Sequence, residues 1–213
     1  MSVQGTDEWF ADRAGKATAS RIAEIIAKTK KGEYSASRGH YLVEKAMERL
    51  TGKSADKYTT AAMRWGTATE DEARAAYEAA TGVLVTQVGM IPHPRIAMAG
   101  ASPDSLVGDD GLLEIKCPNT ATHIGTLRSK KPAGEYVTQM AWQMACTGRA
   151  WCEFVSYDPR MPDGLDLFVM RVHRDDAMIA MLETEVEAFL AEVDALVVEL
   201  QGMAQTGDTK CEF

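Results

Sequence analysis

Three residues that could support metal-assisted chemistry lie near the middle of the 213-residue chain: Asp104, Glu114 and Lys116. Two short apolar segments flank a Gly-Asp-Asp-Gly run at 108–111, which is the pattern of a β-hairpin. Side chains two apart in a strand share a face, so Glu114 and Lys116 point the same way. With residues 108–110 as the loop, Asp104 lies opposite Glu114, whereas a two-residue loop would turn Asp104 to the other face.

Opposed carboxylates in a hairpin lie about 4.5–5.5 Å apart at their Cβ atoms and destabilise the sheet. The arrangement becomes favourable if a divalent cation lies between the two carboxylates. Mg²⁺ suits such a place, because it is held by one or two carboxylates, with waters and substrate phosphates completing its shell. A lysine beside it can orient or help deprotonate a water, or stabilise a negative transition state. The alternative is a solvated hairpin face with no metal.

The elements that must position these residues follow from hydrophobic spacing and cap signals. Residues 67–70 form a capping box, which would place Glu70 in the first turn of its helix, where a carboxylate favours the helix dipole. Gln139 and Gln143 lie one turn apart on a later helix. The order of elements predicts an α/β (α+β) fold with a mixed central sheet flanked by helices. Helices are expected at 36–51, 67–81, 118–129, 134–147 and 175–201, and strands at 83–91, 96–101, 150–158 and 165–173.

Composition indicates one domain over residues 1–213, with 202–213 as a polar, mobile tail. No apolar run reaches the roughly 18 residues of a membrane span, and the N-terminus lacks a signal-peptide pattern, so we expect a cytoplasmic protein without a membrane partner. Four cysteines show no zinc spacing and are expected as buried thiols. The net charge of −8 argues against coating nucleic acid through a broad basic surface, but is compatible with a narrow basic channel.

The pattern Pro-Asp, a spacer and Glu-x-Lys resembles the PD-(D/E)xK nuclease superfamily. Along almost its whole length the chain also resembles the lambda-type phage exonucleases, or YqaJ-like recombinases. This resemblance implies a restriction-endonuclease-like core and a Mg²⁺-dependent 5′→3′ exonuclease. Such an enzyme degrades one strand of linear double-stranded DNA to mononucleotides and leaves a 3′ overhang for phage or prophage recombination. The matching segments are 7–13, 18–20, 65–70, 102–104, 111–118, 136–139 and 157–161.

The resemblance also implies roles for individual residues. Asp104 and Glu114 would be metal ligands, assisted by the main-chain carbonyl of Ile115. Lys116 would be the catalytic lysine, and Glu70 an additional carboxylate at the metal site. Two Mg²⁺ ions per active site are expected, with Mn²⁺ as an alternative, because two ions stabilise both the attacking and the leaving oxygen.

Further residues would bind the DNA end. By the same resemblance, Gln139 is a polar group of the active site, and Arg13 with Ser20 holds the 5′-phosphate. Arginine suits this role because its planar fork donates two charge-assisted hydrogen bonds. Met63 lies where the family carries an apolar residue that wedges apart the terminal base pair, although a core methionine is an equal alternative.

The resemblance implies partners as well: linear DNA with 5′-phosphate ends, two further copies of the chain in a ring-shaped homotrimer, and a single-strand-annealing recombinase. Two other functions stay open from the sequence. One is a structure- or site-specific endonuclease on the same core, which would cut closed circles. The other is a catalytically inactive DNA-end-binding scaffold, against which the complete Asp104, Glu114 and Lys116 set argues.

Overall fold

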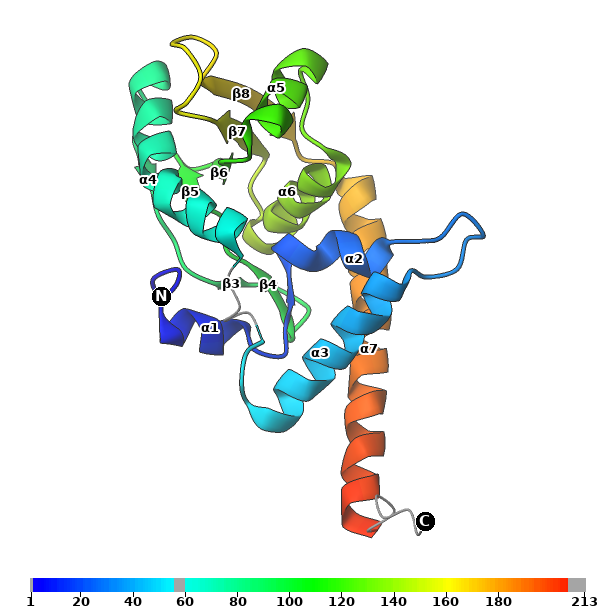
Figure 1. The fold of residues 1–213 in the computed structure, drawn as a ribbon. Coiled ribbons are helices and arrows are strands. Elements are labelled where there is room, and N and C mark those ends of the chain that lie inside the picture. The colour runs from blue at the N-terminus through cyan, green and yellow to red at the C-terminus, as the bar shows by residue number, and fades with distance from the viewer. Residues whose placement is uncertain (1, 56–59, 207–213) are drawn as a thin grey trace.

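A five-stranded mixed sheet forms one end of the molecule in a computed structural model that describes residues 2–55 and 60–206 (Figure 1). Only its β6–β7 pairing is parallel among the described strands, and the other three pairings are antiparallel. This confirms the mixed sheet and the α+β class. From one edge to the other the strands are β2 (Val85–Thr86), β5 (Ser105–Val107), β6 (Gly111–Lys116), β7 (Trp151–Tyr157) and β8 (Leu167–His173).

The central hairpin has the three-residue loop that places Asp104 and Glu114 on one face. Val107 pairs with Gly111, and Ser105 pairs with Leu113. Gly108 begins the turn with a φ of +52°, a conformation that glycine adopts without steric cost. Extending this register by one residue sets Asp104 opposite Glu114, which is the first of the two alternatives that the sequence left open.

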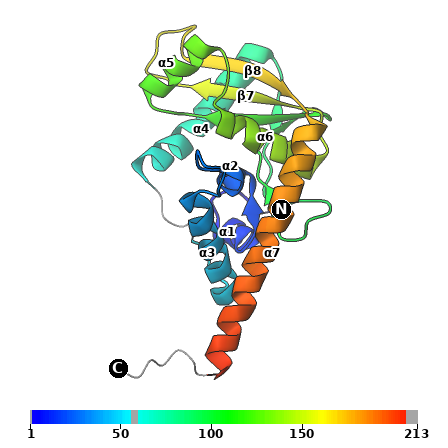
Figure 2. The ribbon, with the colours of Figure 1, turned by 90° about the vertical axis from the view of Figure 1, so that its right-hand side faces the viewer.

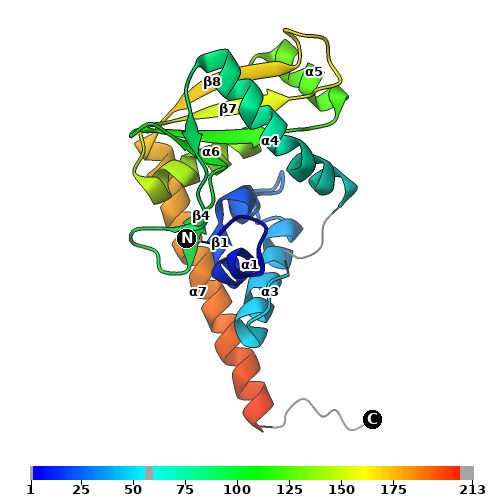
Figure 3. The same ribbon diagram turned by 90° about the vertical axis from the view of Figure 1, so that its left-hand side faces the viewer.

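Helices cover both faces of the sheet. Helix α4 (Ala61–Thr81) packs on one face and α6 (Gly134–Thr147) on the other. Figure 3 shows α4 lying across the sheet. Because both faces are covered, β6 reads as a nearly continuous apolar run rather than an alternating one. Leu113, Ile115 and Val155 face α4, whereas Leu112, Cys152 and Phe154 face α6.

A second, three-stranded sheet joins the N-terminal segment to the chain just before the hairpin. Strand β4 (Ala99–Ala101) lies between β1 (Ala17–Thr18), its parallel neighbour, and β3 (Ile91–Pro92), its antiparallel neighbour. The expected strands at 83–91 and 96–101 are therefore mostly loop, with short pairings near their ends. A strand of two or three residues leaves little periodic signal in a sequence.

Helices form the other end of the molecule. Helix α7 (Asp176–Thr206) packs along α3 (Ala36–Thr51) and projects beyond it (Figures 1 and 2). Helix α3 has the predicted limits, because Gly52 adopts a left-handed cap conformation with a φ of +67°. The remaining helical elements are α1 (Asp7–Arg13), η1 (Ala19–Arg21), α2 (Ile22–Ile26) and α5 (Thr120–Ser129).

Two helix boundaries differ from the prediction. Helix α4 begins at Ala61, so residues 67–70 lie inside the helix and do not cap it. The preceding segment, Ala-Ala-Met-Arg-Trp, contains good helix formers that extend the helix in front of Gly66. Helix α7 likewise continues to Thr206, so residues 202–206 of the expected tail are helical. Within residues 2–55 and 60–206, no helix combines the length and apolar character of a membrane span.

Candidate active site

The hairpin brings Asp104, Glu114 and Lys116 together at the end of β6. The Asp104 Oδ2 accepts the N–H of Ile115 at 2.6 Å, which fixes its carboxylate beside the strand. Lys116 Nζ forms an ion pair with Glu114 Oε1. The side chain of Glu114 is 1% exposed and that of Lys116 is 26% exposed, so the pair lies at the boundary between interior and solvent.

The main-chain carbonyl of Ile115 lies on the same side of β6 as Asp104. A residue of an antiparallel ladder directs its N–H and C=O to the same neighbouring strand. Since the Ile115 N–H meets Asp104, its carbonyl faces the same edge, where β5 has not yet begun. An ion at Asp104 would thus have this carbonyl within its surroundings.

Two glutamines of α6 hold the Glu114 carboxylate. Gln139 Nε2 donates to Oε1 at 2.6 Å, and Gln143 Nε2 donates to Oε2 at 2.5 Å. The structure therefore brings Gln139 to the site as expected. It also assigns a contact to Gln143, which is fully buried and whose role the sequence left open. Their spacing of four residues was the available signal, because it places both amides on one helix face.

Glu70 approaches the same acidic pair from α4. Because α4 starts nine residues earlier, at Ala61, Glu70 lies in a middle turn and the capping-box interpretation was wrong. Burial raises the pKa of Glu70, and the charges of Glu114 and Asp71 raise it further, against the Arg74 guanidinium. Glu70 is thus part of the electrostatic environment of the site.

The protonation behaviour of the other groups shows an excess of negative charge. Burial raises the pKa of Asp104 well above its usual range, and the charges of Glu114 and Glu70 add to this effect. Burial lowers the pKa of Lys116, but the Glu114 and Asp104 charges outweigh it and raise the pKa above its ordinary value. A positive charge placed between these carboxylates would therefore be strongly favoured.

The donor set fits a hard divalent cation. Asp104 and Glu114 would hold the ion, with the Ile115 carbonyl and waters completing its shell, as Mg²⁺ prefers. Among the residues that the structure describes, no three histidine, cysteine, aspartate or glutamate side chains lie close enough to hold an ion by themselves. Glu70 acts on this pair through its charge.

Arg13 and Ser20 meet in a second polar cluster near the N-terminus. Arg13 Nη2 lies 3.4 Å from Ser20 Oγ and 3.4 Å from the hydroxyl of Thr18, which sequence reasoning did not select. The Arg13 guanidinium also lies over the Trp9 ring at 4.2 Å, where it gains a cation–π contact. This cluster could receive a phosphate. The Met63 side chain lies outside the described part of the structure.

Trp9 connects this cluster to the metal-site hairpin. Its Nε1 donates to Ser102 Oγ at 3.0 Å, two residues before Asp104. The parallel pairing of Ala17 with Ala99 supports the same docking. The cluster of Arg13, Thr18 and Ser20 is thus fixed to the segment that carries Asp104.

Helix α3 holds the turn that follows Arg13. Gly15 has a φ of +72°, and its N–H donates to Glu48 Oε2 at 2.7 Å while its carbonyl accepts from Arg49 Nε at 3.0 Å. Glu48 also accepts from Lys45 Nζ at 2.6 Å and from the N–H of Ala55 at 2.7 Å. This buried network anchors the loops on both sides of α3.

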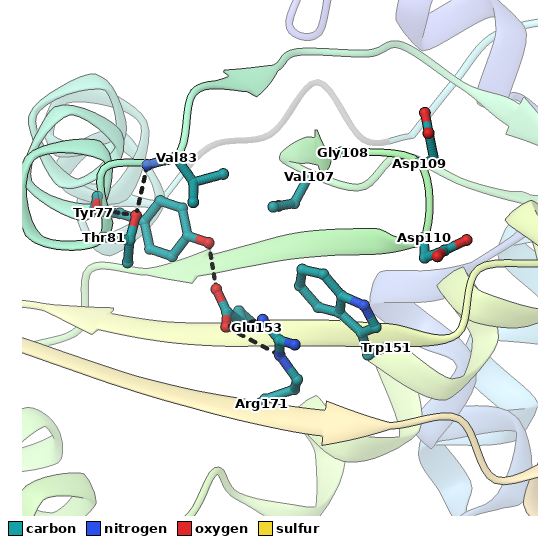
Figure 4. Close-up of a pocket in the computed structure, with 10 residues that line it drawn as sticks. All are labelled: Tyr77, Thr81, Val83, Val107, Gly108, Asp109, Asp110, Trp151, Glu153 and Arg171. Carbon is teal, nitrogen blue, oxygen red and sulfur yellow. Dashed lines mark hydrogen bonds and ion pairs between the residues drawn. The ribbon is translucent and has the colours of Figure 1, made fainter.

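A pocket of about 470 Å³ lies near the hairpin turn, at the other end of β6 (Figure 4). Glu153 accepts from Tyr77 and from Arg171 Nη2, the latter at 2.8 Å, and Arg171 lies over the Trp151 ring at 3.7 Å. None of the predicted site residues lines this pocket. The described pair of Glu153 and Arg171 in this pocket is satisfied internally.

Comparisons with known proteins identify a family and related structures. Residues 8–150 match the model of the YqaJ-like viral recombinase domain. An alkaline exonuclease from Laribacter hongkongensis is 55% identical, with 94% of this chain and 99% of that chain covered and a TM-score of 0.87. Its complex with dAMP gives 54% identity, the same coverage and a TM-score of 0.89.

A more distant match shares the fold. A phage-related exonuclease from Haemophilus somnus is 16% identical over 87% of this chain and 96% of its own, with a TM-score of 0.73. No curated protein sequence matches the chain.

Proposed function

Because the chain belongs to the YqaJ-like viral recombinase family, we propose that it is a Mg²⁺-dependent exonuclease that degrades one strand of linear double-stranded DNA from its 5′ end. The observation that carries this proposal is the meeting of Asp104, Glu114 and Lys116 at one end of β6. This chain, which contains that set, is 55% identical to an alkaline exonuclease.

The protein groups have distinct tasks in the proposed reaction. A bound metal supplies the positive charge that activates water and stabilises the phosphate oxygens. Asp104 and Glu114 hold it, and Gln139 and Gln143 keep the Glu114 carboxylate in one orientation. The Lys116 amine is protonated at neutral pH, and the neighbouring carboxylates raise its pKa further, so it can donate to a phosphate oxygen or to the attacking water.

The N-terminal cluster would give the enzyme its polarity. Arg13, with the hydroxyls of Ser20 and Thr18, can receive a terminal 5′-phosphate through charge-assisted hydrogen bonds. The contact of Trp9 with Ser102 fixes this cluster relative to the metal-binding strand. A DNA end held there would present a phosphodiester to the site in a constant register. The dAMP complex of the Laribacter exonuclease supports a mononucleotide as the product.

We further propose that the chain acts in phage or prophage recombination in the cytoplasm of a bacterial host, beside a single-strand-annealing recombinase. A ring-shaped homotrimer around DNA would explain how a chain of charge −8 stays on a polyanion, because enclosure replaces part of the electrostatic attraction. An exposed apolar row on α3, formed by Val43, Met47 and Leu50, is available for self-association. Sedimentation of the full chain tests the assembly.

The decisive experiment compares a linear duplex carrying a labelled 5′-phosphate end with a relaxed circle of the same sequence. We expect Mg²⁺-dependent release of mononucleotides from the linear DNA alone, stopped by EDTA and absent in Asp104→Ala. A matched duplex with a 5′-hydroxyl end should be digested more slowly, and Arg13→Ala should remove that difference. Cutting of the circle would instead indicate an endonuclease. No cleavage by folded protein would indicate a scaffold.

A further inference from the structure

Arg74 connects Glu70 on α4 with the start of β5, next to Asp104. It lies on α4, one turn after Glu70, and is 9% exposed. Its Nη2 donates to Glu70 Oε1 at 2.6 Å, and its Nε donates to Ser105 Oγ at 3.3 Å. Ser105 is fully buried and donates to the main-chain carbonyl of Asp104 at 2.6 Å. One guanidinium therefore links the helix that carries Glu70 to the strand that begins directly after Asp104.

The remaining donors of Arg74 are also engaged. Nη1 donates to Asp71 Oδ1 at 2.5 Å. The Gln87 amide, in the orientation that satisfies both of its ends, accepts from Nη1 and Nη2 at 2.9 Å each. A guanidinium has five N–H donors in a fixed plane, and these contacts account for all five. A group held in this way has a single orientation and transmits that orientation to its partners.

Glu70 needs such a partner because its surroundings are negative. It is subject to repulsion from Glu114, and it in turn acts on Asp104. The side chain of Glu70 is 30% exposed, so it can rotate towards solvent and away from the other carboxylates. The contact with Arg74 opposes this rotation.

We propose that Arg74 is a positioning residue of the metal site, which fixes Glu70 relative to the Asp104 segment so that the charge of this third carboxylate adds to the binding of the cation. The inference rests on the proposed nuclease function and deepens it. A purely structural role would make Arg74 a link between α4 and β5 whose loss lowers stability and leaves metal affinity unchanged.

Metal binding separates these two roles without relying on activity. Binding of Mn²⁺ to the DNA-free full chain can be followed by the electron paramagnetic resonance signal of the free ion. We expect Arg74→Gln to weaken Mn²⁺ affinity about 10-fold or more, the usual effect of losing a group that orients a metal ligand. Arg74→Lys should recover part of the affinity, because a lysine keeps the charge and loses the fork.

Two further variants test how Arg74 acts. In a Glu70→Gln background, Arg74→Gln should cause no further loss of Mn²⁺ affinity, because its effect passes through Glu70. Arg38→Gln is the matched control: Arg38 is 4% exposed and pairs with Glu192 at 2.7 Å on the helical side of the molecule. It should lower the melting temperature and leave Mn²⁺ affinity unchanged.

The possible failures are distinguishable. Wild-type affinity in folded Arg74→Lys and Arg74→Gln, or equal losses with and without Glu70, would overturn the role of Arg74 and leave the nuclease proposal standing. A wild-type chain that neither binds Mn²⁺ nor digests DNA would overturn the proposed function, and this inference with it.

Discussion

Two lysine–glutamate pairs of this molecule, each with a buried carboxylate, have the same chemistry and different surroundings. Lys45 and Glu48 on α3 have side chains that are 2% and 0% exposed, and Lys116 and Glu114 on β6 have side chains that are 26% and 1% exposed. Glu48 also accepts two main-chain N–H groups, from Gly15 and Ala55, so its charge is met from several sides. Breaking such a pair leaves an uncompensated charge in the interior.

The pair on β6 is surrounded by further acid. Asp104 and Glu70 add their negative charges to that of Glu114, and the amides that hold Glu114 are neutral. The lysine also has access to solvent and so to a substrate. The difference shows that burial of an ion pair does not by itself indicate function. A surplus of like charge around the pair does, because folding alone gives no reason to keep it.

The largest expected effect is on catalysis by the β6 pair. Glu114→Gln keeps the size of the side chain and removes the charge that would hold the metal. The turnover rate should fall on the order of 10³-fold, a typical cost of losing one main electrostatic group of an active site. The melting temperature should fall only slightly, because the loss of accepted hydrogen bonds is offset by the removal of repulsion from Asp104 and Glu70. Digestion of linear duplex and thermal melting monitored by circular dichroism measure the two effects, and turnover near that of the wild type would contradict the assignment.

The α3 pair should show the reverse behaviour. Glu48→Gln leaves Lys45 without its carboxylate partner at 2.6 Å, so the free energy of unfolding should fall by about 3 kcal/mol. Activity per folded molecule should persist well below the melting temperature. Urea denaturation gives the stability, and Glu44→Gln is a control, because Glu44 lies 3.3 Å from the same lysine and is 24% exposed. Equal losses in both variants would argue against a special role for Glu48.

The smallest expected effect is on the stability of the metal-free protein, which the carboxylates of the acidic site lower. The pKa of Asp104 is raised on folding, so the folded chain binds more protons than the unfolded chain between pH 3.8 and the raised pKa. Stability contributed by this group therefore falls as the pH rises through that window. Asp104→Asn should stabilise the metal-free protein by about 1 kcal/mol above the window and by nothing below pH 3.8. Denaturation in EDTA across this pH range measures the difference, and a gain independent of pH would point to another cause.

Local signals in the sequence reduced the hairpin to two alternatives, a three-residue loop and a two-residue loop, and the structure has the first. The length of the 108–110 turn fixes the pairing of Ser105 with Leu113, and thereby the opposition of Asp104 and Glu114. Gly52 marks the end of α3 for an equally local reason. Arg13 and Ser20 also meet as expected, although their meeting was inferred from resemblance and not from spacing.

Other parts depend on packing between distant segments. The capping-box pattern at 67–70 is a local signal, and the longer helix that overrides it gives Glu70 a different setting. The contact of Gln143 with Glu114 exists only because α6 packs on one face of β6. Arg74 reaches Ser105 only because α4 packs on the other face. The spacing of residues within one segment cannot predict these contacts between distant segments.

The parallel pairing of β1 with β4 has a consequence for how the molecule is assembled. Ala17 and Ala99 are separated by most of the first hundred residues, so their contact closes a long loop, whereas the β5–β6 hairpin closes locally. During synthesis the hairpin can form as soon as it leaves the ribosome. The cluster of Arg13, Thr18 and Ser20 can dock only after β4 has been synthesised. The hydrogen bonds of Gln139 and Gln143 to Glu114 can form only after α6 has been synthesised. A chain that ends before α6 would therefore carry the acidic hairpin without the two glutamines that hold the Glu114 carboxylate.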